Sequence, residues 1–172
     1  MPLDPQRIRR LAVLGPAASA KDTDHMWAGS VYAGGGSSHV LAPHAVSVLE
    51  GLQARAKGHM EVVNYTGPSV EAAGEWLRSG DGQGADLAIV VVTADSTETR
   101  DRETLNLDST ADALVEEVAT LVPTLVIMQT AGAVLTPWRD RVKAIAALFL
   151  GGEQAGHALA AVLFGDEVPQ GR

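Results

Sequence analysis

The stretch Asp86-Leu-Ala-Ile-Val-Val-Val-Thr93 decides the fold, because it is an almost continuous apolar run of the length of one strand. Such a run is typical of a parallel strand that is covered on both faces of a sheet. Four more segments have the composition and length of strands: Leu11–Leu14, Glu61–Tyr65, Thr124–Gln129 and Ala144–Leu150. We therefore expect a five-stranded sheet with Asp86–Thr93 near its centre.

Helical segments alternate with these strands. Apolar residues recur at helical spacing within residues 45–56, 70–77, 111–121 and 155–163, which predicts four helices. Ser69 is a suitable N-cap, Gly165 ends the last helix, and Thr136-Pro137 opens a further short helical turn. The alternation predicts one α/β domain over residues 1–172, with a three-layer, doubly wound, mostly parallel sheet and helices on both faces.

Composition argues against several classes of function. The chain has 172 residues and a formal net charge of −8, and an acidic chain lacks the basic surface that binds nucleic acid. It has no cysteine, and its five histidines show no metal-binding spacing, so we expect no metal and no other cofactor. No signal peptide and no apolar run of about 20 residues is visible. We expect a soluble chain without membrane contact and leave its compartment unassigned.

Two loops at the carboxyl ends of the predicted strands hold candidate functional residues, because ligands of such sheets bind at that edge. Gly34–Ser38 is rich in glycine but lacks the spacing and the lysine of a phosphate-binding loop, which favours a flexible loop lining a pocket. Ser96–Arg102 is the most charged loop. One carboxylate of this loop could act as a general acid if a neighbour raised its pKa. The alternative is a solvated loop in which Asp101 and Arg102 form local ion pairs.

The three tryptophans have different predicted roles. Trp27 lies in a loop beyond the first strand, where its flat face could bind a sugar, whereas Trp76 and Trp138 are most simply explained by packing. The Gly-x-Ser-x-Gly pattern of a serine hydrolase is absent.

Several blocks, in order along nearly the whole chain, resemble the C-terminal α/β sandwich domain of glycoside hydrolase family 3, the β-glucosidase family. The resemblance implies a flavodoxin-like sandwich. The loop Glu98-Thr-Arg-Asp-Arg102 with Leu105-Asn-Leu107 is similar to the family's Glu-Gly-x-Asp-Arg-x-x-Leu-x-Leu loop, although Thr99 replaces glycine and Asp108 replaces proline. The other blocks are Arg10–Pro16, Gly34–Val40, Leu49–Leu52, Ala85–Val92, Thr130–Trp138, Ala158–Gly165 and Val168–Arg172.

This resemblance implies a role for each candidate residue. Glu98 would be the general acid/base of a retaining β-glucosidase-type hydrolase, and Asp101 and Arg102 would support its loop. Trp27, Ser37 and Ser38 would bind the substrate, a β-linked glucoside or xyloside. The family's nucleophilic Asp lies on a barrel domain, and nothing in these 172 residues can form that barrel. We expect a barrel domain or partner chain to supply it, and the isolated chain to be inactive.

Two alternatives remain open at this point. The chain could be a stand-alone, non-catalytic carbohydrate-binding or assembly module, which an exposed apolar patch would favour. An unrelated nucleotide or phosphate binder is disfavoured by the missing phosphate-loop pattern. For Glu98 itself, we expect an exposed carboxylate that is ionised at neutral pH, stabilised by Arg100 and Arg102, on a mobile loop with few apolar anchors.

Overall fold

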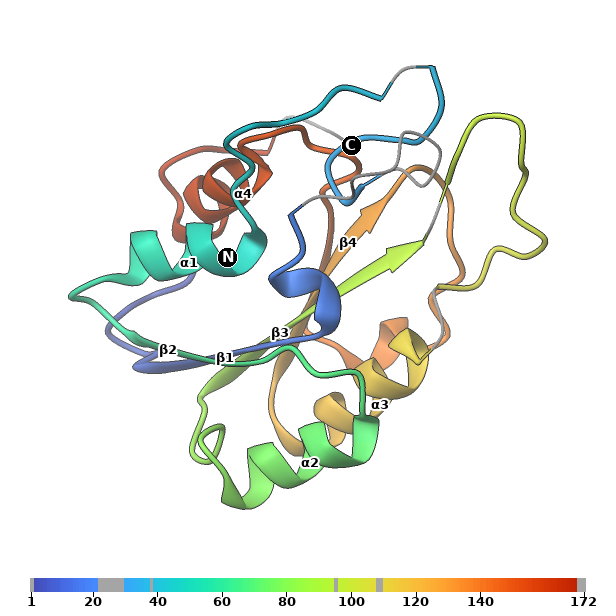
Figure 1. Ribbon diagram of the computed structural model, residues 1–172. Coiled ribbons are helices and arrows are strands. Elements are labelled where there is room, and N and C mark those ends of the chain that lie inside the picture. The colour runs from blue at the N-terminus through green and yellow to red at the C-terminus, as the bar shows by residue number, and fades with distance from the viewer. Residues whose placement is uncertain (1, 22–29, 38, 95, 108–109, 170–172) are drawn as a thin grey trace.

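A computed structural model describes residues 2–21, 30–37, 39–94, 96–107 and 110–169. Five strands form one sheet in the order β2-β1-β3-β4-β5, and all four neighbouring pairs are parallel (Figure 1). The strands are β1 Arg10–Leu14, β2 Glu61–Tyr65, β3 Leu87–Ala94, β4 Thr124–Thr130 and β5 Ala144–Ala147. The sheet confirms the predicted doubly wound α/β fold, with β3 as its central strand.

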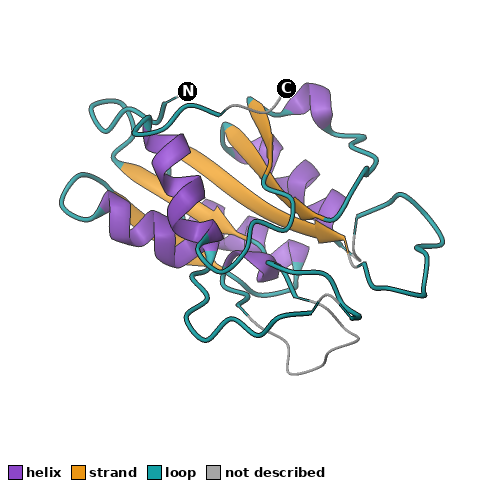
Figure 2. Ribbon diagram, turned by 90° about the horizontal axis from the view of Figure 1, so that it is seen from above, coloured by secondary structure: helices purple, strands orange, loops and turns teal. Residues whose placement is uncertain are grey.

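Helices cover both faces of this sheet. The helix pair α1 and α4 covers one face and the pair α2 and α3 covers the other, as Figures 1 and 2 show from two directions. The helices are α1 Val48–Ala56, α2 Val70–Ser79, α3 Ala111–Leu121 and α4 Ala155–Phe164, with short 3-10 helices at Pro16–Ala18 and Arg139–Arg141. Ser69 caps α2 by accepting a hydrogen bond from the Ala72 N–H, as predicted.

Each face has its own apolar core, because successive strand residues point to opposite sides. Leu11 and Val13 of β1 pack toward α1 and α4. Ala12 and Leu14 pack toward α2 and α3. All but one of the residues of β3 are buried, which explains why its sequence reads as an unbroken apolar run.

The helices α1 and α4 approach each other most closely at two glycines. A Cβ atom built on Gly51 would lie 2.1 Å from the Gly156 carbonyl oxygen, and one on Gly156 would lie 2.0 Å from the Ser47 carbonyl oxygen. Both distances are far below van der Waals contact. This helix pair therefore requires glycine at both positions.

The last third of the chain departs in detail from the prediction. The strand β5 ends at Ala147 rather than Leu150, and Phe149 has a φ of 55°, which is uncommon for a bulky side chain. The short helical turn lies at Arg139–Arg141, just after Thr136-Pro137. Trp138 is fully buried and its indole N–H donates to Asp112 Oδ1 at 2.7 Å. Trp138 therefore serves packing, as predicted.

Candidate functional site

Glu98 lies on the loop that follows the central strand β3, and its side chain is exposed as predicted. The loop is held by the glycine-rich turn 34–37. The Gly35 N–H donates to the Ser96 carbonyl at 3.4 Å, and the Glu98 N–H donates to the Gly35 carbonyl at 3.2 Å. These two backbone hydrogen bonds join the loop to the turn at a place where the sequence offers few apolar anchors. The mobility of the loop stays a prediction.

The carboxylate of Glu98 is bound by one residue of that turn. The Ser37 N–H donates to Glu98 Oε2 at 2.6 Å, and the Ser37 hydroxyl donates to the same oxygen at 2.5 Å. The Ser37 hydroxyl first, and its N–H second, lower the pKa of Glu98, since hydrogen bonds to a carboxylate stabilise its charged form. Glu98 is therefore ionised at neutral pH, as expected.

Gly36 makes this contact possible. Its φ is 101°, and a Cβ atom there would lie 2.3 Å from Glu98 Cβ and 2.6 Å from Glu98 Oε2. The loop residue Thr99, which stands where the family motif has glycine, has a φ of 68°. Thr99 thus adopts a left-handed conformation that glycine would take with less strain.

Arg102 supports the loop through a different contact from the one expected. Its Nη2 donates to the Ala133 carbonyl at 2.6 Å, which joins the loop after β3 to the loop after β4. Among the described residues, neither Arg100 nor Arg102 forms an ion pair with Glu98. The expectation that these arginines stabilise the carboxylate is wrong, because the Ser37 donors do so. Asp101 is exposed, and the described part of the chain gives it no ion pair with Arg102.

Of the predicted substrate-binding residues, Ser37 belongs to the described part of the chain, and it contacts Glu98. Trp27 and Ser38 lie outside the described residues. Sequence reasoning missed Gln129, which lies near the end of β4 and has only 3% of its surface exposed. Its Nε2 donates to the Val31 carbonyl at 3.4 Å, while its Oε1 has no hydrogen-bond partner in the described structure. The sequence signal for this residue was an amide side chain directly after the apolar run Leu125–Met128.

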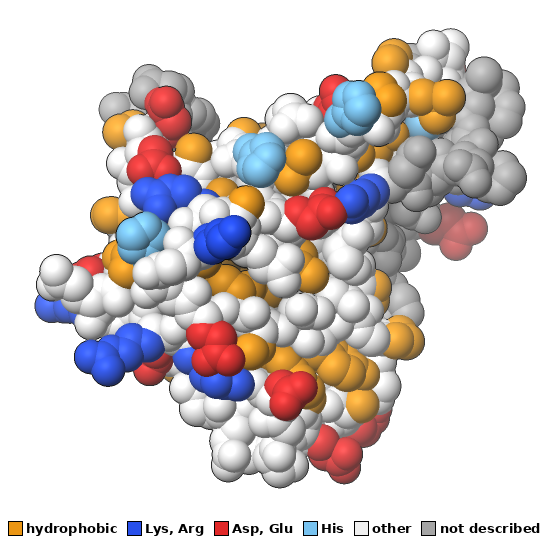
Figure 3. Space-filling view, turned by 60° about the vertical axis from the view of Figure 1, so that its left-hand side comes forward, with side chains coloured by type: hydrophobic (Ala, Val, Ile, Leu, Met, Phe, Trp, Pro, Cys, Tyr) orange, Lys and Arg blue, Asp and Glu red, His pale blue; other side chains and the backbone are white. Residues whose placement is uncertain are grey.

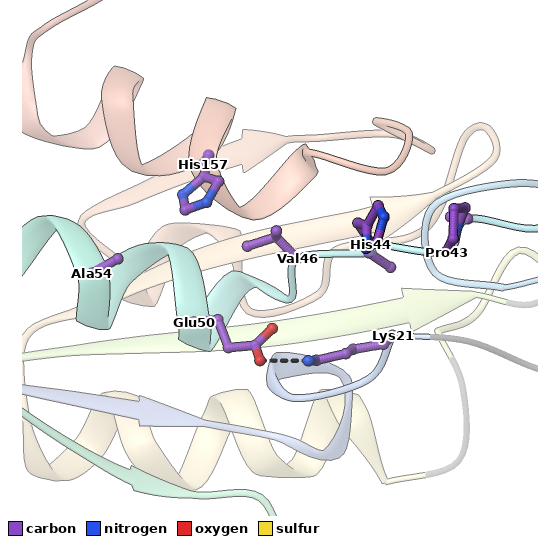
Figure 4. A pocket seen from close by; sticks show the side chains of 9 residues that line it. Lys21, Pro43, His44, Val46, Glu50, Ala54 and His157 are labelled. Carbon is purple, nitrogen blue, oxygen red and sulfur yellow. Dashed lines mark ion pairs between the residues drawn. The ribbon is translucent and has the colours of Figure 1, made fainter.

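A cavity of about 600 Å³ lies between α4 and the start of α1 (Figure 4). Lys21 and Glu50 form an ion pair on one side of it, and His44 and His157 line it from other elements. The charges of the ion pair cancel, so the cavity has no net charge while the histidines are neutral. On the face shown in Figure 3, acidic and basic side chains are interspersed rather than gathered in one patch.

Within the described ranges, no group of three or more His, Cys, Asp or Glu side chains could hold a metal ion. The same part of the chain contains no helix that is long and apolar enough to cross a membrane.

Comparison with known proteins shows which family the chain resembles in sequence and fold. Residues 1–172 match the model of the glycosyl hydrolase family 3 C-terminal domain. The chain is 35% identical over 157 residues to the probable β-glucosidase E of Emericella nidulans, covering 84% of this chain and 15% of that protein. It is 34% identical to the exo-α-(1→6)-L-arabinopyranosidase of Bifidobacterium longum, covering 82% of this chain and 20% of that protein.

A solved structure agrees with the sequence matches. The β-glucosidase from Chaetomella raphigera superimposes with a TM-score of 0.76 and 26% identity, over 96% of this chain and 25% of that one. The chain spans about 11–21% of the length of the curated relatives it matches.

Proposed function

The chain belongs to the glycosyl hydrolase family 3 C-terminal domain family, and on that premise we propose that it supplies the general acid/base carboxylate of a retaining β-glycosidase. Glu98 is the proposed acid/base. The observation that supports this role is its position, exposed at the carboxyl edge of the sheet directly after β3 and bound by the Gly36-Ser37 turn. That edge is where parallel α/β sheets bind ligands.

The chemistry requires a second carboxyl group. Retaining glycosidases use two carboxyls about 5–5.5 Å apart, one as nucleophile and one as acid/base. In the first step Glu98 gives its proton to the leaving-group oxygen while the glycosidic C–O bond breaks and the nucleophile binds the sugar. In the second step the ionised Glu98 takes a proton from water while the water oxygen bonds to the sugar and the bond between the sugar and the nucleophile breaks, which frees the nucleophile. The nucleophile is proposed to lie on a barrel domain outside these 172 residues.

The names of the relatives support a substrate class, which is part of the same proposal. We assign β-linked glucosides or xylosides, with Ser37 and the residues around it on the substrate side of the loop. The match to an exo-α-(1→6)-L-arabinopyranosidase widens the pyranoside panel that should be assayed. The isolated 172-residue chain is expected to leave aryl β-glucosides intact, because it lacks the nucleophile that divides the reaction into two easier steps.

The test uses Glu98→Ala in the enzyme that contains both this domain and the nucleophile-bearing domain. Hydrolysis of a substrate with a poor leaving group should fall by about 10²–10⁴-fold, the usual contribution of a general acid. The glycosylation step on a substrate with a good leaving group should fall much less, since it needs little protonation. Glu103→Ala, an exposed glutamate of the same loop, is the matched control. Unchanged hydrolysis of the poor substrate by Glu98→Ala would refute the assignment.

A non-catalytic assembly module is the second candidate, and one surface favours it. A groove of about 410 Å³ beside β5 is lined mostly by apolar side chains, together with Thr130, Thr136 and Arg139. Ile145 and Phe149 in it are 37% and 58% exposed. Phe149→Ser should weaken binding to the nucleophile-bearing domain, whereas Val168→Ser, also an exposed apolar residue, should not. This candidate would be favoured if Phe149→Ser abolished hydrolysis by the assembled enzyme while Glu98→Ala left hydrolysis unchanged.

A further inference from the structure

The turn that holds Glu98 binds it in an asymmetric way. Both donors of Ser37 reach Oε2, at 2.6 and 2.5 Å, and the described residues give Oε1 no hydrogen-bond partner. A neutral carboxyl group keeps its proton on one oxygen, and here Oε2 already accepts two hydrogen bonds. While both Ser37 groups donate to Oε2, a proton that Glu98 passes to a leaving group would sit on Oε1.

We propose that Ser37 is a positioning residue that fixes Glu98 through Oε2 and holds it in its proton-accepting form, an inference that rests on the proposed function. We call the two hydrogen bonds from Ser37 to Glu98 Oε2 the Ser37 clamp. Three features of the structure support the clamp independently of any titration. Two hydrogen bonds come from one residue, Gly36 leaves room for the carboxylate only because it has no Cβ atom, and the Glu98 N–H is bound to the Gly35 carbonyl. Three consecutive residues, Gly35, Gly36 and Ser37, thus contact both the side chain and the backbone of Glu98.

The clamp has opposite effects on the two steps of the reaction. The second step needs an ionised Glu98 to accept a proton from water, and the clamp favours that form. The first step needs a protonated Glu98, and the clamp opposes that form because each Ser37 hydrogen bond stabilises the charge. The lowered pKa of Glu98, caused first by the Ser37 hydroxyl, agrees with this direction.

Other ionisable groups near Glu98 do not replace Ser37. Arg100, Asp101, Arg102 and Glu103 share its loop, and His39 follows the facing turn. In the described residues none of these side chains forms an ion pair or hydrogen bond with the Glu98 carboxylate. Ser37 is therefore the residue whose removal should change the proton affinity of Glu98 most.

The experiment is a carbon-13 NMR titration of the Glu98 side-chain carboxyl in the 172-residue chain, with the signal assigned by its loss in Glu98→Gln. Ser37→Ala should raise the pKa of Glu98 toward the ordinary glutamate value. Ser37→Thr, which keeps both donors, should titrate close to the unchanged chain. Ser79→Ala removes an exposed hydroxyl from the distant helix α2 and should have no effect. An unchanged titration in Ser37→Ala, or an equal shift in Ser37→Thr, would overturn the clamp.

Kinetics in the enzyme assembled with the nucleophile-bearing domain give a second reading. Ser37→Ala should move the basic limb of the kcat/KM profile to higher pH and slow deglycosylation relative to glycosylation. A fall of both steps by the same factor, with no movement of the pH profile, would reduce Ser37 to a merely structural residue.

The NMR titration needs neither substrate nor partner. Its failure would therefore remove the clamp and leave the acid/base role of Glu98 standing. Conversely, a shifted titration together with unimpaired hydrolysis by Glu98→Ala would remove the proposed function and leave the clamp.

Discussion

Gly51 and Gly36 both lie where a methyl group would collide with a neighbour, yet the neighbours differ in kind. At Gly51 the obstacle is the carbonyl of Gly156, 2.1 Å from the added Cβ atom, in the backbone of a packed helix. At Gly36 it is the side chain of Glu98, with Cβ at 2.3 Å and Oε2 at 2.6 Å. A helix backbone moves only with the whole helix, whereas the contact at Gly36 can be relieved by a shift of the exposed loop that carries Glu98. The first glycine therefore maintains the fold, and the second maintains the geometry of the proposed site.

The largest loss of stability is expected from Gly51→Ala. The added methyl group forces α1 and α4 apart, and overpacking of this kind costs about 3 kcal/mol of unfolding free energy. Urea denaturation monitored by circular dichroism measures it. Gly132→Ala is the matched control, because nothing lies within 4 Å of its Cβ position, and it should change stability by less than about 0.5 kcal/mol. Similar values for the two variants would show that the close helix contact is not required.

A buried side-chain contact should have an intermediate effect. Asp112→Ala removes the acceptor of the Trp138 indole N–H, a hydrogen bond of 2.7 Å at a fully buried ring. An unsatisfied buried donor costs about 1–3 kcal/mol, which the same denaturation experiment would detect. The result shows how much stability is lost when a buried side-chain contact is removed without any change in the packing of two helix backbones. A cost near zero would mean that water replaces the carboxylate at the indole.

Gly36→Ala should affect stability less and the site more. An alanine at a φ of 101° is strained, by about 1–2 kcal/mol. Its methyl group would displace the Glu98 carboxylate from Ser37, so the pKa of Glu98 should rise. Denaturation and the carboxyl titration are measured on the same sample. An unchanged pKa of Glu98 would show that the turn moves and the carboxylate keeps its contact with Ser37. Gly36 would then affect stability alone, as Gly51 does.

The smallest expected effect is a pH dependence at Asp86. Its carboxylate accepts hydrogen bonds from the N–H groups of Arg10 and Arg9, at 3.0 and 2.8 Å, and these lower its pKa. A carboxylate with a lowered pKa stabilises the fold above its ordinary pKa, and that contribution is lost as the pH falls toward the lowered value. Asp86→Asn should flatten the acid side of the stability curve. An equally steep curve would show that the two N–H donors do not distinguish the ionised form.

The sequence predicts more of the fold than of the site. The five strands follow from short apolar runs, and burial of β3 on both faces explains why its run is the clearest. Residues 144–150 are apolar throughout, so the sequence does not mark the end of β5, which lies at Ala147, two residues before the left-handed Phe149. Glu98 was identified by its resemblance to a family motif, while its exposure was predicted from its charged loop.

The contact between Ser37 and Glu98 could not be predicted from either loop alone. The two residues are 61 positions apart, and neither loop has the periodicity that relates sequence to contact. The fold brings them together because β1 and β3 are neighbours in the sheet. The same reason explains why Arg100 and Arg102, close in sequence to Glu98, were wrongly expected to stabilise it. Trp27 and Ser38 remain predictions.

The most direct test of the acid/base role is chemical rescue of Glu98→Ala by azide in the enzyme assembled with the nucleophile-bearing domain. Without the Glu98 base, water attacks the glycosyl-enzyme slowly, whereas azide attacks without needing its proton removed. We predict that azide raises the turnover of an aryl β-glucoside and that the product is a glycosyl azide of retained β configuration. Turnover that azide does not change, with no glycosyl azide formed, would contradict the assignment of Glu98.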